Sequence, residues 1–89
     1  MLSCGFRMSE LTTRLESVDD ERTFVAFLKA LETDFRSNPG QWQNSSIEAF
    51  LECAASWAED TRNGAPNYVM PSNAWKRAAD IIYCGKIYE

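Results

Sequence analysis

Three stretches of this chain place large apolar residues three or four positions apart, and segments rich in Pro, Gly or Asn separate them. The first apolar stripe consists of Phe24, Phe27, Leu28, Leu31 and Phe35. This spacing puts the side chains on one side of an α-helix. Acidic residues from Asp19 to Glu21 suit the start of a helix, and Pro39 and Gly40 end it. Together these features predict a helix over residues 20–37.

The second stretch begins with a sequence typical of a helix N-terminus. Ser45 and Glu48 have the spacing of a capping box, in which Ser45 is the N-cap and Glu48 reaches back to its amide. The predicted buried side of this helix consists of Ile47, Phe50, Leu51, Ala54, Trp57 and Ala58. Asn63 and Gly64 favour a left-handed stop. We therefore expect a helix over residues 46–61.

The third stretch predicts a helix that begins at Ser72 or Asn73, with Gly85 just past its end. Its predicted buried side consists of Trp75, Ala78, Ala79, Ile82 and Tyr83. Residues 62–72 contain two prolines, which predict an irregular connection rather than a strand.

Near-helical spacing also precedes the first stripe, at Met8, Leu11, Leu15 and Val18. It predicts a short helix at 9–17 with Ser9 as its cap. Strand-like alternation of useful length and internal repeats are absent from the sequence. We therefore expect an all-α fold, a bundle of three to four helices around one core. We expect residues 1–17 to be an N-terminal leader that holds the short helix, and residues 18–89 to be a single helical domain.

Charge and residue content argue against several classes of function. Thirteen acids against nine bases give a net charge of −4, and the chain has no histidine. An acidic chain offers no excess of cations to phosphates, so nucleic acids and anionic membranes are unfavourable partners. Glu-x-x-His metal motifs need an imidazole, and no calcium-loop pattern is present. The sequence therefore predicts no enzyme activity, no cofactor and no metal site.

The cysteines indicate a reducing compartment. Cys4, Cys53 and Cys84 are an odd number, and none forms a C-x-x-C pair. Small disulfide scaffolds normally carry four or more cysteines. We expect free thiols in the cytoplasm, with Cys53 and Cys84 wholly or partly buried as small apolar side chains.

The most distinctive charge feature lies in the predicted second helix. Between residues 37 and 61 the chain carries four acids and no base; the acids are Glu48, Glu52, Glu59 and Asp60. Glu48 and Glu52 lie one helical turn apart, and like charges at this spacing repel. The row is either a solvated helix face or a docking surface for a basic protein.

A docking surface would use Glu48, Glu52, Glu59 and the aromatic side chain of Trp42, which precedes the helix. This non-enzymatic protein-binding module is our leading hypothesis. The alternative is a small-molecule or peptide binder with an aromatic pocket near Trp42 and Trp75. An enzyme that uses carboxylates or Cys84 is a third and weaker hypothesis. A homodimer is compatible with all three.

Several motifs resemble those of a family of small acidic bacterial proteins of unknown function. The most specific are the W-x-N element at Trp42 and Asn44 and the ending K-I-Y-E from Lys86 to Glu89. The resemblance covers about residues 18–89 and implies a soluble helical domain. It brings no activity, cofactor or catalytic residue, but it implies that Trp42, Asn44, Trp75 and Tyr88 act as a set.

Overall fold

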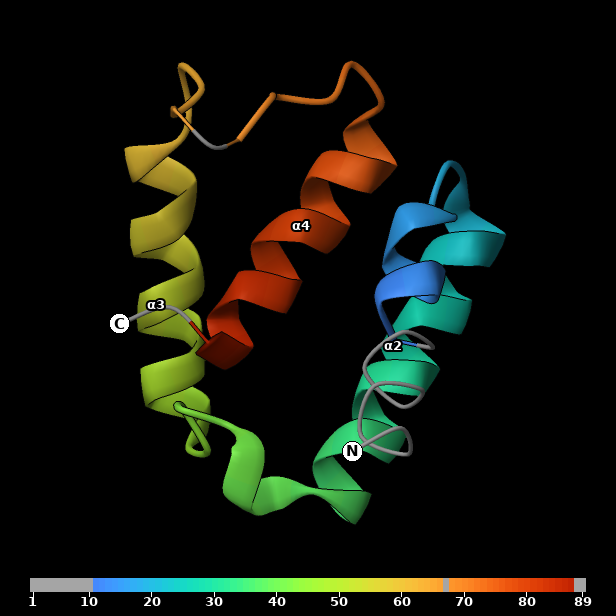
Figure 1. Cartoon of the computed structure of the whole chain (residues 1–89), viewed down its shortest axis with the longest axis vertical. Coiled ribbons are helices and arrows are strands. Elements are labelled where there is room, and N and C mark those ends of the chain that lie inside the picture. Colours follow the sequence, from blue (N-terminus) through green and yellow to red (C-terminus); the bar gives the residue numbers. More distant parts are fainter. Residues whose placement is uncertain (1–10, 67, 88–89) are drawn as a thin grey trace.

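The computed structural model describes residues 11–66 and 68–87, and in this part of the chain the fold is all-α, as the sequence predicts (Figure 1). The named elements, in order, are helix α2 (Glu21–Ser37), the one-turn 3₁₀ helix η1 (Pro39–Gln41), helix α3 (Ile47–Asp60) and helix α4 (Ala74–Ile87). Residues 11–16 are also helical and precede α2. Ser9, the expected cap of that short helix, lies outside the described residues.

Helix α2 begins where its acidic run predicts. The Asp20 carboxylate accepts hydrogen bonds from the backbone N and the hydroxyl of Thr23 at 2.9 and 2.7 Å. These bonds stabilise the charged form and hold the pKa of Asp20 below its ordinary value. Helix α4 begins in a similar way, because Asn73 Oδ1 accepts from the backbone N atoms of Trp75 and Lys76.

The predicted cap of α3 is wrong by one residue. Ser46, not Ser45, is the N-cap, and its Oγ accepts a hydrogen bond from the backbone N of Ala49 at 3.1 Å. Glu48 then occupies the second helical position, whereas a capping box uses the third. Residues 62–66 and 68–73 are irregular, as expected for the predicted connection over 62–72, with an isolated bridge between Ala65 and Tyr68.

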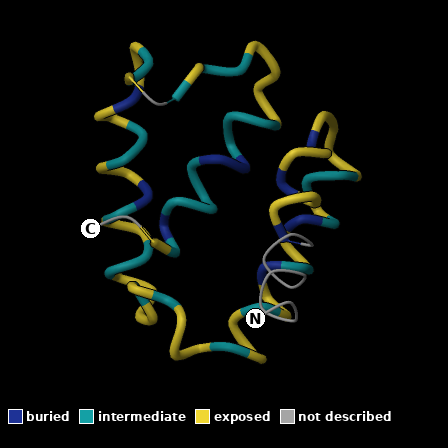
Figure 2. The backbone as a smooth tube through the Cα atoms, viewed as in Figure 1, coloured by how far each residue is buried: buried dark blue, intermediate teal, exposed yellow. Residues whose placement is uncertain are grey.

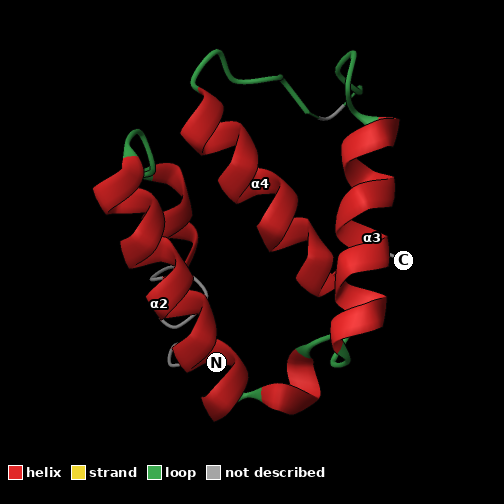
Figure 3. Ribbon diagram, turned by 180° about the vertical axis from the view of Figure 1, so that it is seen from behind, coloured by secondary structure: helices red, strands yellow, loops and turns green. Residues whose placement is uncertain are grey.

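Helix α4 lies between α2 and α3 and packs on both, while the backbones of α2 and α3 stay apart (Figures 1 and 3). The buried core lies mainly along α2, α4 and the segment that precedes α2 (Figure 2). It consists of Leu11, Leu15, Val18, Phe27, Leu31 and Ala79. Within the described residues, no helix has the length and apolar character needed to cross a membrane.

Gly85 lies inside α4 and is buried, so its predicted role just past the helix end is wrong. A methyl group at this position would lie 2.9 Å from the nearest carbon of the Phe50 ring and 3.0 Å from the Phe50 carbonyl oxygen. Only glycine allows α3 and α4 to approach this closely.

Three residues predicted to be buried are exposed: Ile47 at 76%, Leu51 at 59% and Trp75 at 40%. Among the described helices, only α4 packs closely on α3, and a single partner helix covers a narrow strip of its surface. Phe50, Ala54 and Trp57 lie on that strip and are buried or half-buried, whereas Ile47 and Leu51 face solvent.

Candidate functional site

The acidic row of α3 is accessible in the structure. Glu48, Glu52 and Glu59 are all exposed. The ion pairs found in the described residues join Arg36 to Glu32, Lys76 to Asp80 and Lys86 to Asp34, so none involves Glu48, Glu52 or Glu59. These carboxylates therefore interact with solvent rather than with cations of the described chain.

An apolar groove lies beside the start of this row, and we call it the α2–α3 groove. Its volume is about 260 Å³, and it opens between α2 and the N-terminal end of α3. Its apolar lining consists of Leu28, Leu31, Phe35, Trp42, Ile47 and Phe50. Leu28 and Phe35 are each 37% exposed, so part of the apolar stripe of α2 faces solvent here. The groove exists because α2 and α3 diverge on either side of α4.

Trp42 is half-buried in the wall of the groove, where several contacts fix its position. The Phe35 ring meets it edge-on with ring centroids 4.9 Å apart, and the Phe50 ring stacks on it at 6.0 Å. The indole Nε1 donates a hydrogen bond to Asp34 Oδ2 at 2.8 Å. Lys86 Nζ binds the same oxygen at 2.8 Å and lies 5.7 Å from the centroid of the indole ring. Trp42 is therefore held in one orientation, with part of its ring accessible.

The structure brings only some of the predicted site residues together. Trp42 lines the groove, and Glu48 follows the groove residue Ile47 on α3. Glu59 lies 11 positions beyond Glu48, about 16 Å along the helix at the usual rise per residue. The acidic row therefore runs away from the groove rather than surrounding it.

Trp42 and Trp75 do not share a pocket. Trp75 lies at the start of α4, where its ring packs on Phe24 with centroids 5.5 Å apart. Trp42 contacts Lys86 near the opposite end of the same helix. The aromatic pocket of the alternative hypothesis is thus limited to the rings around Trp42.

Two of the residues implied by the family resemblance, Trp42 and Asn44, lie in one network of contacts. Asn44 Nδ2 donates to the carbonyl oxygen of Gly85 at 3.0 Å, and the backbone N of Gln43 donates to the carbonyl oxygen of Lys86 at 3.0 Å. The side chain of Lys86 binds Asp34, and Asp34 in turn accepts the hydrogen bond from Trp42. The W-x-N element therefore joins the end of α4 to α2, whereas Tyr88 lies outside the described residues.

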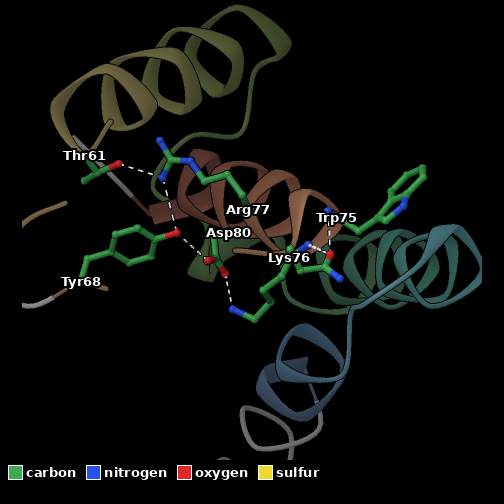
Figure 4. Close-up of polar contacts among 7 residues, drawn as sticks. Thr61, Tyr68, Trp75, Lys76, Arg77 and Asp80 are labelled. Atoms are coloured by element: carbon green, nitrogen blue, oxygen red, sulfur yellow. Dashed lines mark hydrogen bonds and ion pairs between the residues drawn. The ribbon is translucent and has the colours of Figure 1, made fainter. Parts of the chain in front are cut away.

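A polar cluster centred on Arg77 occupies the other end of the molecule (Figure 4). The guanidinium donates to Thr61 Oγ1 and to the carbonyl oxygen of Ala58, each at 3.0 Å. It also lies 5.1 Å from the centroid of the Trp57 ring and 5.6 Å from that of Tyr68, within the range of cation–π attraction.

Asp80 completes this cluster. Its carboxylate accepts from the Tyr68 hydroxyl at 2.7 Å and from Lys76 Nζ at 2.6 Å. The pKa of Tyr68 is raised mainly by burial and, to a smaller extent, by the hydrogen bond to Asp80. Among the described residues, no buried side-chain nitrogen or oxygen lacks a hydrogen-bond partner. The cluster is thus internally satisfied, and it ties the irregular connection to α3 and α4.

The thiol of Cys84 is poorly suited to nucleophilic chemistry. Burial raises its pKa from 9.0 to about 11, with a further contribution from the charge of Asp80. Thiolates are the reactive form of cysteine, so this side chain stays protonated and inert at neutral pH. Cys53 and Cys84 are both half-buried free thiols, as the sequence predicts.

Three exposed apolar residues of the groove, Leu28, Phe35 and Ile47, are not among the site residues predicted from the sequence. One feature of the sequence does indicate this exposure. The α2 stripe contains the adjacent residues Phe27 and Leu28, so it is wider than the strip that one helix can cover.

Comparison with known proteins places most of the chain in one group. The model of a family of unknown function, DUF7660, matches residues 20–89. No curated protein and no solved structure matches the chain.

Proposed function

This chain belongs to that family of unknown function, and from this premise we propose that it is a non-enzymatic protein-binding module of the cytoplasm. The supporting observation is the row of exposed carboxylates on α3, which begins beside an apolar groove. The partner is a basic protein, and Glu48, Glu52, Glu59 and Trp42 contribute to the contact.

The charge distribution favours a cationic partner. No Lys or Arg occurs between residues 37 and 61, so the outer side of α3 carries only negative charge. Glu48 and Glu52 repel each other by a few tenths of a kcal/mol at i, i+4 spacing, and a bound cation removes that repulsion. Complementary charges of this kind raise association rates and select against wrong partners.

The groove fits a protein segment better than a separate small molecule. At about 260 Å³ it is smaller than typical small-molecule sites, which span ~300–1,000 Å³ and enclose most of their ligand. The groove also lies at the surface, between two helices whose backbones stay apart. We therefore favour a protein or peptide partner whose side chains enter the groove while the rest of it stays outside.

Charge reversal on α3 tests this function. The variant Glu52→Lys/Glu59→Lys changes the acidic row at positions that do not line the groove, and Glu16→Lys/Glu21→Lys makes the same charge change elsewhere on the surface. We expect affinity capture from a lysate of the source cells, quantified by mass spectrometry, to yield a basic protein with wild type and the control. With the α3 variant, the captured amount of that protein should be at least ten-fold lower. Identical partner profiles for all three proteins would refute the proposal.

A further inference from the structure

We propose that the α2–α3 groove anchors the apolar side of a basic amphipathic helix, whose cationic side lies along the acids of α3. This inference rests on the proposed function and adds the form of the partner segment. In the bound state, the apolar side chains of the partner helix contact Leu28, Phe35, Trp42 and Ile47.

The groove is already formed in the free chain. Trp42 is held by Asp34 and by ring contacts with Phe35 and Phe50, so the wall requires no rearrangement to receive a side chain. Ile47 is 76% exposed at the opposite edge and has apolar area available for contact. Binding to such a preorganised surface avoids much of the cost of ordering side chains.

The shape suits a helix better than an extended segment. The walls come from two helices that diverge (Figures 1 and 3). Their apolar side chains line one open depression. An amphipathic helix presents large apolar side chains at i, i+3 and i+4, close enough together to enter one depression. The cationic residues that flank this apolar strip of the helix then lie next to the rim.

The rim selects for positive charge. Glu32 lines the groove on the α2 side, and Glu48 follows Ile47 on the α3 side, with Glu52 one turn further along. No Lys or Arg is among the residues that line the groove. Arg36 pairs with Glu32 at 2.6 Å, but both side chains are largely exposed, so this pair is weak and easily replaced.

The same charges disfavour a second copy as the occupant. A two-fold contact is self-complementary, so a groove-to-groove dimer would bring Glu48 and Glu52 of both copies into one interface. Each copy has a net charge of −4, and unpaired like charges at an interface cost binding energy. A basic helix from another protein meets no such repulsion.

Binding of designed peptides to the full chain tests the inference. The probe is a labelled helical peptide with Leu on one side and Lys on the other. One control peptide has the same Lys residues with Ser in place of Leu, and another has Glu in place of Lys. Ile47→Ser changes the groove without touching the core, and Val69→Ser makes a similar change at an 88% exposed residue of the connection.

We expect fluorescence anisotropy to show the Leu/Lys peptide binding at least ten-fold more tightly than either control peptide. Ile47→Ser should weaken that binding about ten-fold, and Val69→Ser should leave it unchanged. If the Ser/Lys peptide binds as tightly as the Leu/Lys peptide and Ile47→Ser does not change its binding, the groove is not the anchoring site. The proposed function would then still stand.

Three other outcomes also count against the inference. If neither cationic peptide binds, the acidic row attracts no cations and the proposed function fails as well. Equal binding of the Leu/Glu peptide would show that the rim charges select nothing. Sedimentation that shows a dimer lost in Ile47→Ser would assign the groove to a second copy instead.

Discussion

Gly85 shows how one residue sets the distance between two helices. Glycine inside a helix lowers stability relative to alanine by about 1 kcal/mol, so helix propensity alone would favour a substitution. At Gly85, however, the Phe50 ring and carbonyl occupy the space that a methyl group would need. Asn44 also binds the Gly85 carbonyl, so a shift of this turn would disturb the segment that leads into α3.

We expect Gly85→Ala to lower the free energy of unfolding by about 1–3 kcal/mol, because overpacking outweighs the gain in helix propensity. Gly40→Ala is the matched control, since nothing lies within 4 Å of the position its methyl group would take. Urea denaturation followed by circular dichroism measures both. A Gly85→Ala protein as stable as wild type would show that α3 can move away without cost.

At the scale of elements, local sequence signals predict the helices well and their ends less well. The stripe of α2 and its acidic start gave bounds within one residue, because Asp20 is a strong cap and Pro39 a strong stop. The start of α3 offers two adjacent serines, and spacing to Glu48 favoured the wrong one. Which serine caps the helix depends on where the preceding segment is held, and long-range bonds from Gln43 and Asn44 to the end of α4 hold it.

Substitution of the two serines separates their roles. Ser46→Ala should lower the free energy of unfolding by about 1 kcal/mol, because it removes the acceptor for the backbone N of Ala49. Ser45→Ala, one residue earlier and also exposed, should change it by less than about 0.5 kcal/mol, as is usual for surface substitutions. Thermal and urea denaturation of the two single variants make the comparison. If Ser45→Ala lowers the free energy of unfolding more than Ser46→Ala does, then Ser45 is the N-cap, as the sequence predicts.

At the scale of the whole molecule, the sequence indicated which residues are apolar but not which of them remain uncovered. Ile47 and Phe50 belong to the same predicted stripe, yet one is exposed and the other contacts Trp42 and Gly85. The difference arises because α3 has a single helical partner, and helical spacing carries no information about the number of partners. The acidic row was predictable, since it depends on position along one helix. The groove was not, since it depends on how α2 and α3 diverge.

One partly buried carboxylate joins α2 to α4 and to the segment that precedes α3. Asp34 on α2 accepts from Trp42 and from Lys86 on α4, and the Lys86 side chain is only 11% exposed. We expect Asp34→Asn to lower the free energy of unfolding by about 1–3 kcal/mol, because it leaves a poorly solvated ammonium group without its counter-ion. Glu32→Gln, on the same helix, breaks an ion pair whose side chains are 65–73% exposed and should cost less than about 1 kcal/mol.

Chemical denaturation monitored by tryptophan fluorescence compares the two variants. The Asp34 variant should also alter the emission of the folded protein, because an uncharged amide oxygen accepts a weaker hydrogen bond from Trp42 than a carboxylate does, whereas the Glu32 variant should not. Equal stability losses would mean that the buried and exposed pairs contribute alike, and that the apolar core and the aromatic contacts of Trp42 hold α2 in place without the Asp34 charge. In that case the groove would persist without Asp34, and its wall would depend on Phe35 and Phe50.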